Sequence, residues 1–165
     1  MGIFLNQFYS PISNRREDSY TGETIEGRTR LHCQVISAVR EAVGPDFLVA
    51  LRLGACDYQE GGSTQADAVA ACKIFEAAGI DLLDISGGLC GYRGDGSKIP
   101  GYFGNESQAI REAVSVPVIL TGGVRTGLAA ETLLEEGKAD LIGVGRSVLK
   151  DSSWAKKAFV ELGIE

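Results

Sequence analysis

Residues 117–124 read Pro-Val-Ile-Leu-Thr-Gly-Gly-Val, a short apolar run that ends in a pair of glycines. We predict a strand over 117–121, and the apolar residues of 128–136, followed by Gly137, predict a helix directly after it. A second short apolar run over 141–144 predicts the next strand. Strand, helix and strand in this order are typical of a parallel sheet whose strands are joined by right-handed helical crossovers.

The same alternation extends through the rest of the chain. Helices are predicted over 26–43, from Ser63 or Thr64 to Ala78, near 106–114 and in the tail that contains Trp154, Phe159 and Leu162. Strands are predicted over 47–53 and 82–86. No linker interrupts this pattern, so we expect one α/β domain, either an open doubly wound sheet or a (β/α)8 barrel, with ligands at the carboxyl ends of the strands.

Two of these elements carry specific expectations about burial. In the first helix, Leu31, Val35, Val39 and Val43 recur at four-residue steps with Ile36 alongside, and they predict one buried stripe. The strand over 47–53 is almost continuously apolar, which is typical of a strand buried on both faces. Arg52 is the one charged residue in that strand.

Composition limits the classes of function. With 165 residues the chain is long enough for one domain and too short for an ordinary full barrel of about 250 residues. A net charge of -6 argues against binding to nucleic acid or to an anionic membrane and favours a small-molecule ligand. The four cysteines form no Cys-x-x-Cys pair and predict no metal site, and we expect a cytoplasmic protein.

The loops after the last two predicted strands have the composition of a phosphate site. Gly122 and Gly123 precede a helix, where backbone N–H groups and the helix dipole favour an anion. Gly145 and Arg146 follow the next strand, and a guanidinium can donate two hydrogen bonds to phosphate oxygens. Such paired loops recur after the seventh and eighth strands of (β/α)8 barrels. The alternative is that the glycines only turn the chain.

Charged residues elsewhere have competing interpretations. A buried unpaired guanidinium is costly, so Arg52 should meet an anion or an electron-rich ligand, or else form an ion pair with Asp84 near the end of the next strand. His32 lies away from any strand end and is interpreted as structural. The segment that contains Arg15, Arg16, Asp18, Glu26, Arg28 and Arg30 is either a solvated face or a tie between the opening residues and the first helix.

The opening residues carry a specific motif. Residues 2–11 read G-I-F-L-N-Q-F-Y-S-P and residues 14–20 read N-R-R-E-D-S-Y. This resembles the old yellow enzyme segment G-Y-L-x-N-Q-F-x-S-P…N-x-R-x-D-x-Y-G-G. The similarity continues through the helix that ends at Gly44, the strand with Arg52, and the T-G-G-V and G-V-G-R segments near the end, so it covers essentially the whole chain.

The resemblance implies the C-terminal half, strands five to eight, of a flavin-binding (β/α)8 TIM barrel. Residues 1–165 would form a single FMN-binding half-barrel domain, with 1–24 as the opening loop after the fourth strand and 25–165 as β/α units. It implies that Arg52 contacts the flavin ring near its N1 and O2 edge. It also implies that Gly122, Gly123, Gly145 and Arg146 hold the FMN phosphate.

In the family, hydride passes from NAD(P)H to the flavin and then to an activated alkene or related acceptor, with a protein acid as proton donor. The family's paired substrate-binding His/His or His/Asn residues belong to the fourth strand and lie outside this chain, and Ile3 stands where many members have a proton-donating tyrosine. We therefore assign no catalytic residue and expect impaired activity of the chain alone.

A half-barrel has two sheet edges and an apolar interior to cover, so we expect pairing with itself or with an N-terminal half-barrel. Two other functions stay open. One is a non-catalytic half-barrel that binds phosphate ligands or partners. The other is a different phosphate-binding TIM-barrel enzyme, for which only Asp84 offers a carboxylate at a strand end.

Overall fold

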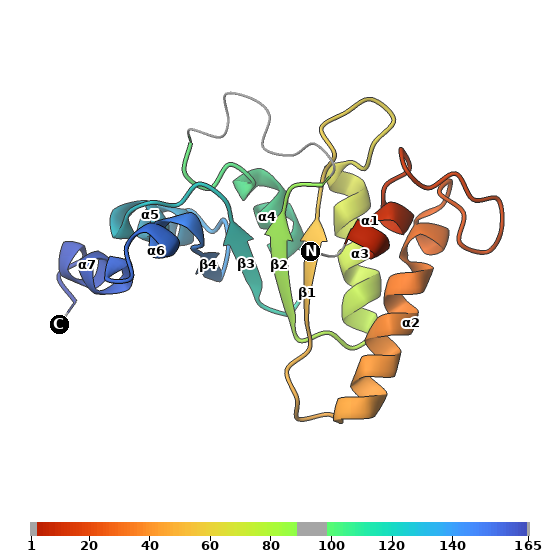
Figure 1. Cartoon of the computed structure of the whole chain (residues 1–165), viewed down its shortest axis with the longest axis horizontal. Coiled ribbons are helices and arrows are strands. Elements are labelled where there is room, and N and C mark those ends of the chain that lie inside the picture. The colour runs from red at the N-terminus through yellow and green to blue at the C-terminus, as the bar shows by residue number, and fades with distance from the viewer. Residues whose placement is uncertain (1–2, 89–98, 165) are drawn as a thin grey trace.

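The architecture is a parallel sheet with helices between its strands (Figure 1). The computed structural model describes residues 3–88 and 99–164. Strands β1 (Ala50–Gly54), β2 (Leu82–Ser86), β3 (Val118–Thr121) and β4 (Leu141–Gly143) form a four-stranded sheet in the order β1-β2-β3-β4. Every neighbouring pair is parallel. The predicted alternation of strand and helix is confirmed.

The helices correspond closely to the predicted ones, with two additions. They are α1 (Ile3–Tyr9), α2 (Ile25–Val43), α3 (Gln65–Ala77), α4 (Gly104–Arg111), α5 (Gly127–Glu135), α6 (Arg146–Lys150) and α7 (Trp154–Glu161). Helix α1 lies inside the opening segment that we expected to be a loop, and the short α6 was not predicted. Thr64 caps α3 through a hydrogen bond to the N–H of Asp67, and Gly44, with φ of 81°, ends α2.

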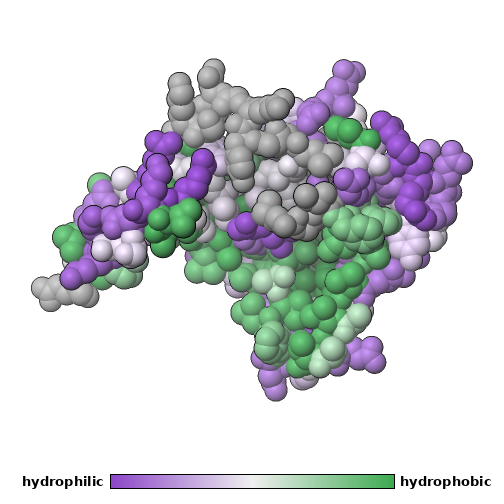
Figure 2. Space-filling model, viewed as in Figure 1, coloured by the Kyte–Doolittle hydropathy of each residue, from purple (hydrophilic) through white to green (hydrophobic). Residues whose placement is uncertain are grey.

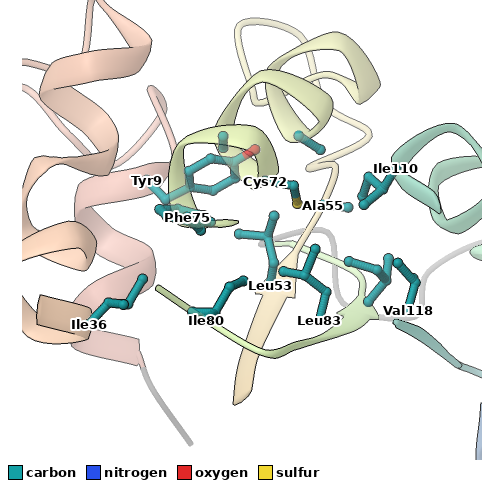
Figure 3. Packing of buried hydrophobic residues seen from close by; sticks show 13 residues of the cluster. Tyr9, Ile36, Leu53, Ala55, Cys72, Phe75, Ile80, Leu83, Ile110 and Val118 are labelled. Carbon is teal, nitrogen blue, oxygen red and sulfur yellow. The ribbon is translucent and has the colours of Figure 1, made fainter. Parts of the chain in front are cut away.

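One face of the sheet is buried under the helices. Side chains alternate along each strand, and the register places Leu53, Leu83, Ile85 and Val118 on the same side of the sheet. Figure 3 shows Leu53, Leu83 and Val118 beside Ile36, Cys72, Phe75 and Ile110 of helices α2, α3 and α4. Phe75, Leu83 and Ile85 have no exposed surface. This cluster is the main core and fixes the positions of the strand ends.

The opposite face of the sheet is much less covered, which corrects the expectation of a strand buried on both faces. Phe47 and Leu48 lie before β1 and are 62% and 60% exposed, and Leu141 of β4 is 49% exposed. Figure 2 shows hydrophobic side chains gathered over the lower part of β1 and β2. The apolar side chains of 47–53 therefore point to both faces of the sheet, and the described residues bury only one of these faces.

The buried stripe predicted for helix α2 is confirmed at Ile36 but is wrong for three of its valines. Val35, Val39 and Val43 are 40%, 40% and 39% exposed, whereas the buried residues of the helix are Gly27, Arg28, Thr29, His32 and Ile36. A polar side chain is buried here because it has a specific partner: Arg28 donates from Nε to the carbonyl oxygen of Tyr9 (2.7 Å) and contacts Asp67 (3.1 Å).

The opening segment is tied down by the charged residues for which we had two interpretations. Arg28 holds Tyr9, and Arg30 donates from Nε to the carbonyl oxygen of Ser19 (2.7 Å). Arg16 pairs with Asp18 at the surface. The segment thus combines a solvated ion pair with links to helix α2.

A buried carboxylate links the opening segment to the loop after β1. Asp57 is 1% exposed and accepts hydrogen bonds from the Ser10 hydroxyl (2.7 Å) and from the Ser63 N–H (2.8 Å). A buried acceptor of this kind is costly to remove because its donors lose their partner.

His32 is structural, as interpreted from the sequence. It is 4% exposed, and its ring lies between those of Tyr9 (6.2 Å between centroids) and Phe75 (5.3 Å). Burial lowers the pKa of His32 to about 4.

Among the described residues, no helix is both long and apolar enough to cross a membrane. Burial raises the pKa values of the thiols of Cys33, Cys56 and Cys72. The fourth cysteine, Cys90, lies outside the described residues.

We expect Asp57→Ala to lower the free energy of unfolding by about 3 kcal/mol, because the Ser63 N–H and the Ser10 hydroxyl lose their common acceptor. Urea denaturation measures the change. Asp46→Ala, at an exposed position, is the control and should change stability by less than about 0.5 kcal/mol. Similar values for the two variants would contradict the role of Asp57.

The burial of His32 makes the stability of the fold depend on pH. Between an unfolded-state pKa near 6.5 and a folded-state pKa of about 4, the unfolded chain binds a proton at His32 that the folded chain does not. The contribution of His32 to the free energy of unfolding is therefore fully present above pH 6.5, and it falls by about 3 kcal/mol as the pH drops to 4. Urea denaturation across this range should show that loss in the wild type and not in His32→Phe. If the free energy of unfolding changes with pH equally in the wild type and in His32→Phe, His32 is not the source of the pH dependence.

Candidate functional site

The loops after β3 and β4 together enclose a pocket at the carboxyl edge of the sheet. Its volume is about 510 Å³. It is lined by residues 121–125 after β3, by Gly143, Arg146, Ser147 and Lys150 around and after the end of β4, and by Tyr102. Because the two strands are parallel neighbours, their carboxyl ends meet at one edge, as predicted.

The glycines after β3 hold a turn that other residues could not adopt easily. Gly122 and Gly123 have φ of 146° and 70°. A Cβ atom at Gly123 would lie 2.8 Å from the ring of Tyr102, so that ring occupies the space of a side chain. These glycines do turn the chain, which was the alternative interpretation. Their backbone also lines the pocket.

The loop after β4 behaves differently. A Cβ atom at Gly145 would meet nothing within 4 Å, so protein packing does not require a glycine there. Gly145 is not among the residues that line the pocket, whereas its neighbour Arg146 is. Ser147 donates from its hydroxyl to the carbonyl oxygen of Val124 (3.1 Å), which joins this loop to the loop after β3.

The pocket is positively charged in an acidic chain. Arg125, Arg146 and Lys150 line it, and no described carboxylate does, although the net charge of the chain is -6. Sequence reasoning identified Arg146 and missed Arg125, Lys150 and Tyr102. The first two could have been found as cations just beyond the glycine loops. Tyr102 lies in the glycine-rich segment 87–104, which the family resemblance places near the mouth of the active site, but the sequence indicated no specific role for this residue.

The start of helix α5 does not contribute as expected. Its first N–H group, that of Gly127, donates to a carboxylate oxygen of Glu161 in α7 (2.7 Å). The Ala129 N–H donates to the Thr126 hydroxyl (3.2 Å). The positive end of this helix is therefore compensated within the protein, and an anion in the pocket would meet the preceding loop instead.

Arg52 lies two strands away from the pocket and is paired. Its Nε donates to Oδ2 of Asp84 (2.7 Å), and Nη2 lies 2.6 Å from the same oxygen. The two residues are register partners in β1 and β2. The structure thus contains the ion pair that was one of our two interpretations.

Asp84 connects Arg52 to the pocket. Its Oδ1 accepts a hydrogen bond from the hydroxyl of Thr121, which lines the pocket (2.7 Å). Gly143 leaves room for that hydroxyl, because a Cβ there would lie 2.3 Å from it. A polar row therefore crosses the less covered face of the sheet from β1 to β3, over roughly 10 Å at the usual spacing of strands.

The arrangement suits a long ligand with an anionic end. The pocket offers three cations and glycine backbone to a phosphate, while Arg52 offers a cation two strands away. Ile3 begins helix α1, and its side chain is outside what the structure describes.

Comparison with known proteins gives concordant results. The profile of the NADH:flavin oxidoreductase / NADH oxidase family matches residues 1–164. An NADPH dehydrogenase from Bacillus licheniformis is 40% identical over 162 residues, which are 98% of this chain and 46% of that protein. A metal reductase from Desulforamulus reducens is 35% identical over 95% of this chain and 24% of its own length. The chain thus spans about half or a quarter of these relatives.

Solved structures agree on the fold. A 2-naphthoyl-CoA reductase complex superposes with a TM-score of 0.85 at 27% identity, over 97% of this chain and 24% of that one. TcOYE with pHBA superposes with a TM-score of 0.77 at 23% identity, over 98% and 41%. The expected fold, the C-terminal half of a (β/α)8 barrel, is confirmed, and so is the resemblance that the opening motif indicated. The chain belongs to the NADH:flavin oxidoreductase / NADH oxidase family.

Proposed function

We propose that this chain provides the phosphate-binding half of an FMN-dependent oxidoreductase of the old yellow enzyme type, within a single half-barrel domain. The observation that carries the proposal is the pocket in which two glycine loops and Arg146 converge. Gly122, Gly123, Gly145 and Arg146 would hold the FMN phosphate. Family membership supports the choice of a flavin among phosphate ligands.

The residues fit such a group on two counts. The pocket's positive charge suits a phosphate dianion, and the open space beside Gly145 leaves its backbone accessible to a ligand. Bound FMN would accept hydride from NAD(P)H and deliver it to an activated alkene or related small molecule. Arg52 would place positive charge beside the ring, where it favours the reduced form.

A second function has one observation in its favour. Because Arg52 is already neutralised by Asp84, the chain also fits a non-catalytic domain that binds a phosphate ligand without using its ring. NAD(P)H oxidation by the FMN-loaded chain, with an enone as acceptor, separates the two. We expect slow but measurable oxidation, since the family's substrate-binding histidines lie outside these residues. The cytoplasmic location stays a prediction.

The exposed apolar surface and the open edges of the sheet bear on whether the chain binds a partner. Apolar side chains are exposed at Phe47, Leu48 and Leu141, and the valines of α2 are half-exposed. The outer strands of the sheet, β1 and β4, each have only one neighbouring strand among the described residues. Large apolar surfaces and open strand edges promote association. We propose that the chain pairs with a second copy or with an N-terminal half-barrel.

Arg146→Ala should weaken FMN binding by about tenfold to a hundredfold, because a charge-assisted pair of hydrogen bonds to the phosphate is lost. The change in the visible spectrum of added FMN measures the affinity. Arg15→Ala, at an exposed arginine of the opening segment, is the control. Equal affinity in the two variants would remove Arg146 from the site, and binding of simple phosphate esters without FMN binding would favour the non-catalytic function.

Pairing is tested by light scattering of the purified chain. We expect a species larger than the 17.5 kDa monomer, and Leu48→Lys should shift it toward the monomer because a charge in the apolar surface is costly to bury. Leu128→Lys, at an exposed leucine of α5, should leave the size unchanged. A monodisperse wild-type monomer would rule out self-pairing and leave only the N-terminal half-barrel as partner.

A further inference from the structure

Tyr102 touches both loops of the phosphate pocket, although it comes from a different part of the chain. Its ring packs on the turn after β3: a Cβ atom would lie 2.9 Å from the ring at Gly122 and 2.8 Å at Gly123. Its hydroxyl lies 3.5 Å from Nη2 of Arg146, beyond β4. Tyr102 itself lines the pocket.

The ring is held firmly from behind. Phe103, which is 4% exposed, packs edge-on against it with centroids 4.5 Å apart. The N–H of Gly101 donates to the carbonyl oxygen of Gly122 (2.7 Å), so the backbone beside Tyr102 is bonded to the same turn. Residues 101–103 therefore act as a brace for the glycine loop.

We propose that Tyr102 both positions and binds the phosphate group. Its ring keeps the Gly122–Gly123 turn in the shape that presents backbone to the ligand, and its hydroxyl donates a hydrogen bond to a phosphate monoester held by Arg146. This inference rests on the proposed phosphate site. It does not depend on whether the ligand also carries a flavin ring.

The chemistry of the hydroxyl supports a direct contact. A guanidinium only donates, so the tyrosine oxygen accepts from Arg146, and a hydroxyl that accepts from a cation becomes a stronger donor. An oxygen of a phosphate dianion is a strong acceptor for that donor. Phenylalanine would preserve the brace and lose the donor, which separates the two roles of Tyr102.

The experiment compares Tyr102→Phe and Tyr102→Ala with the wild-type chain, using FMN, riboflavin and inorganic phosphate as probes. Tyr20→Phe is the matched control, since its hydroxyl bonds Gln34 at the surface and lies outside the pocket. Calorimetry gives the affinities, and hydrogen exchange of residues 122–124 reports the order of the turn. Circular dichroism checks that each variant is folded.

We expect Tyr102→Phe to weaken FMN and inorganic phosphate about tenfold, with riboflavin, which lacks the phosphate, unchanged. Tyr102→Ala should weaken both phosphate ligands further and speed exchange at residues 122–124, whereas Tyr102→Phe should not change exchange. Tyr20→Phe should match the wild type. If the alanine variant does not fold, the phenylalanine variant still decides the role of the hydroxyl.

Unchanged phosphate affinity in Tyr102→Phe, or an equal loss for riboflavin, would overturn the proposed contact. Failure of the wild type to bind inorganic phosphate would overturn it as well. If the wild type binds phosphate but not FMN, the flavin assignment fails while the role of Tyr102 is still measured on phosphate.

Discussion

The parallel pairing of four strands in chain order is the constraint on which the rest of this structure depends. It requires a crossover between each pair of consecutive strands, and it brings the carboxyl ends of all four strands to one edge of the sheet. Loops that are far apart in sequence become neighbours there. The pocket between residues 121–125 and Arg146 exists because β3 and β4 are paired in this way, with Thr121 beside Gly143 in the register.

Parallel pairing alone would leave these loops free to move, and three further contacts hold them. Ser147 donates to the carbonyl oxygen of Val124, the indole of Trp154 donates to that of Arg125 (2.6 Å), and Tyr102 packs against the glycine turn. Each contact joins a different segment to the loop after β3. A ligand entering this pocket would therefore meet a loop backbone that is already in place, which lowers the ordering cost of binding.

The sequence was sufficient for the four strands, for five of the seven described helices and for the two loops of the pocket, because apolar periodicity and paired glycines act locally. It was insufficient where a side chain's environment depends on distant segments. Val35 and Val39 repeat like core residues, but Arg28 and His32 take the inner face of α2 because Tyr9 and Asp67 supply partners for the arginine and Phe75 packs on the histidine ring. The role of Tyr102 depended on tertiary contacts in the same way.

The ion pair of Arg52 with Asp84 and the proposed contact of Arg52 with a flavin are compatible. Asp84 engages Nε and Nη2 of the guanidinium, whose five N–H donors include two on Nη1. Releasing the pair would leave a carboxylate that is only 19% exposed without its cation, which is costly. A ligand therefore binds most favourably when it contacts Arg52 without breaking the ion pair with Asp84. Asp84, which also accepts from Thr121, holds the Arg52 guanidinium along the sheet in the direction of the phosphate pocket.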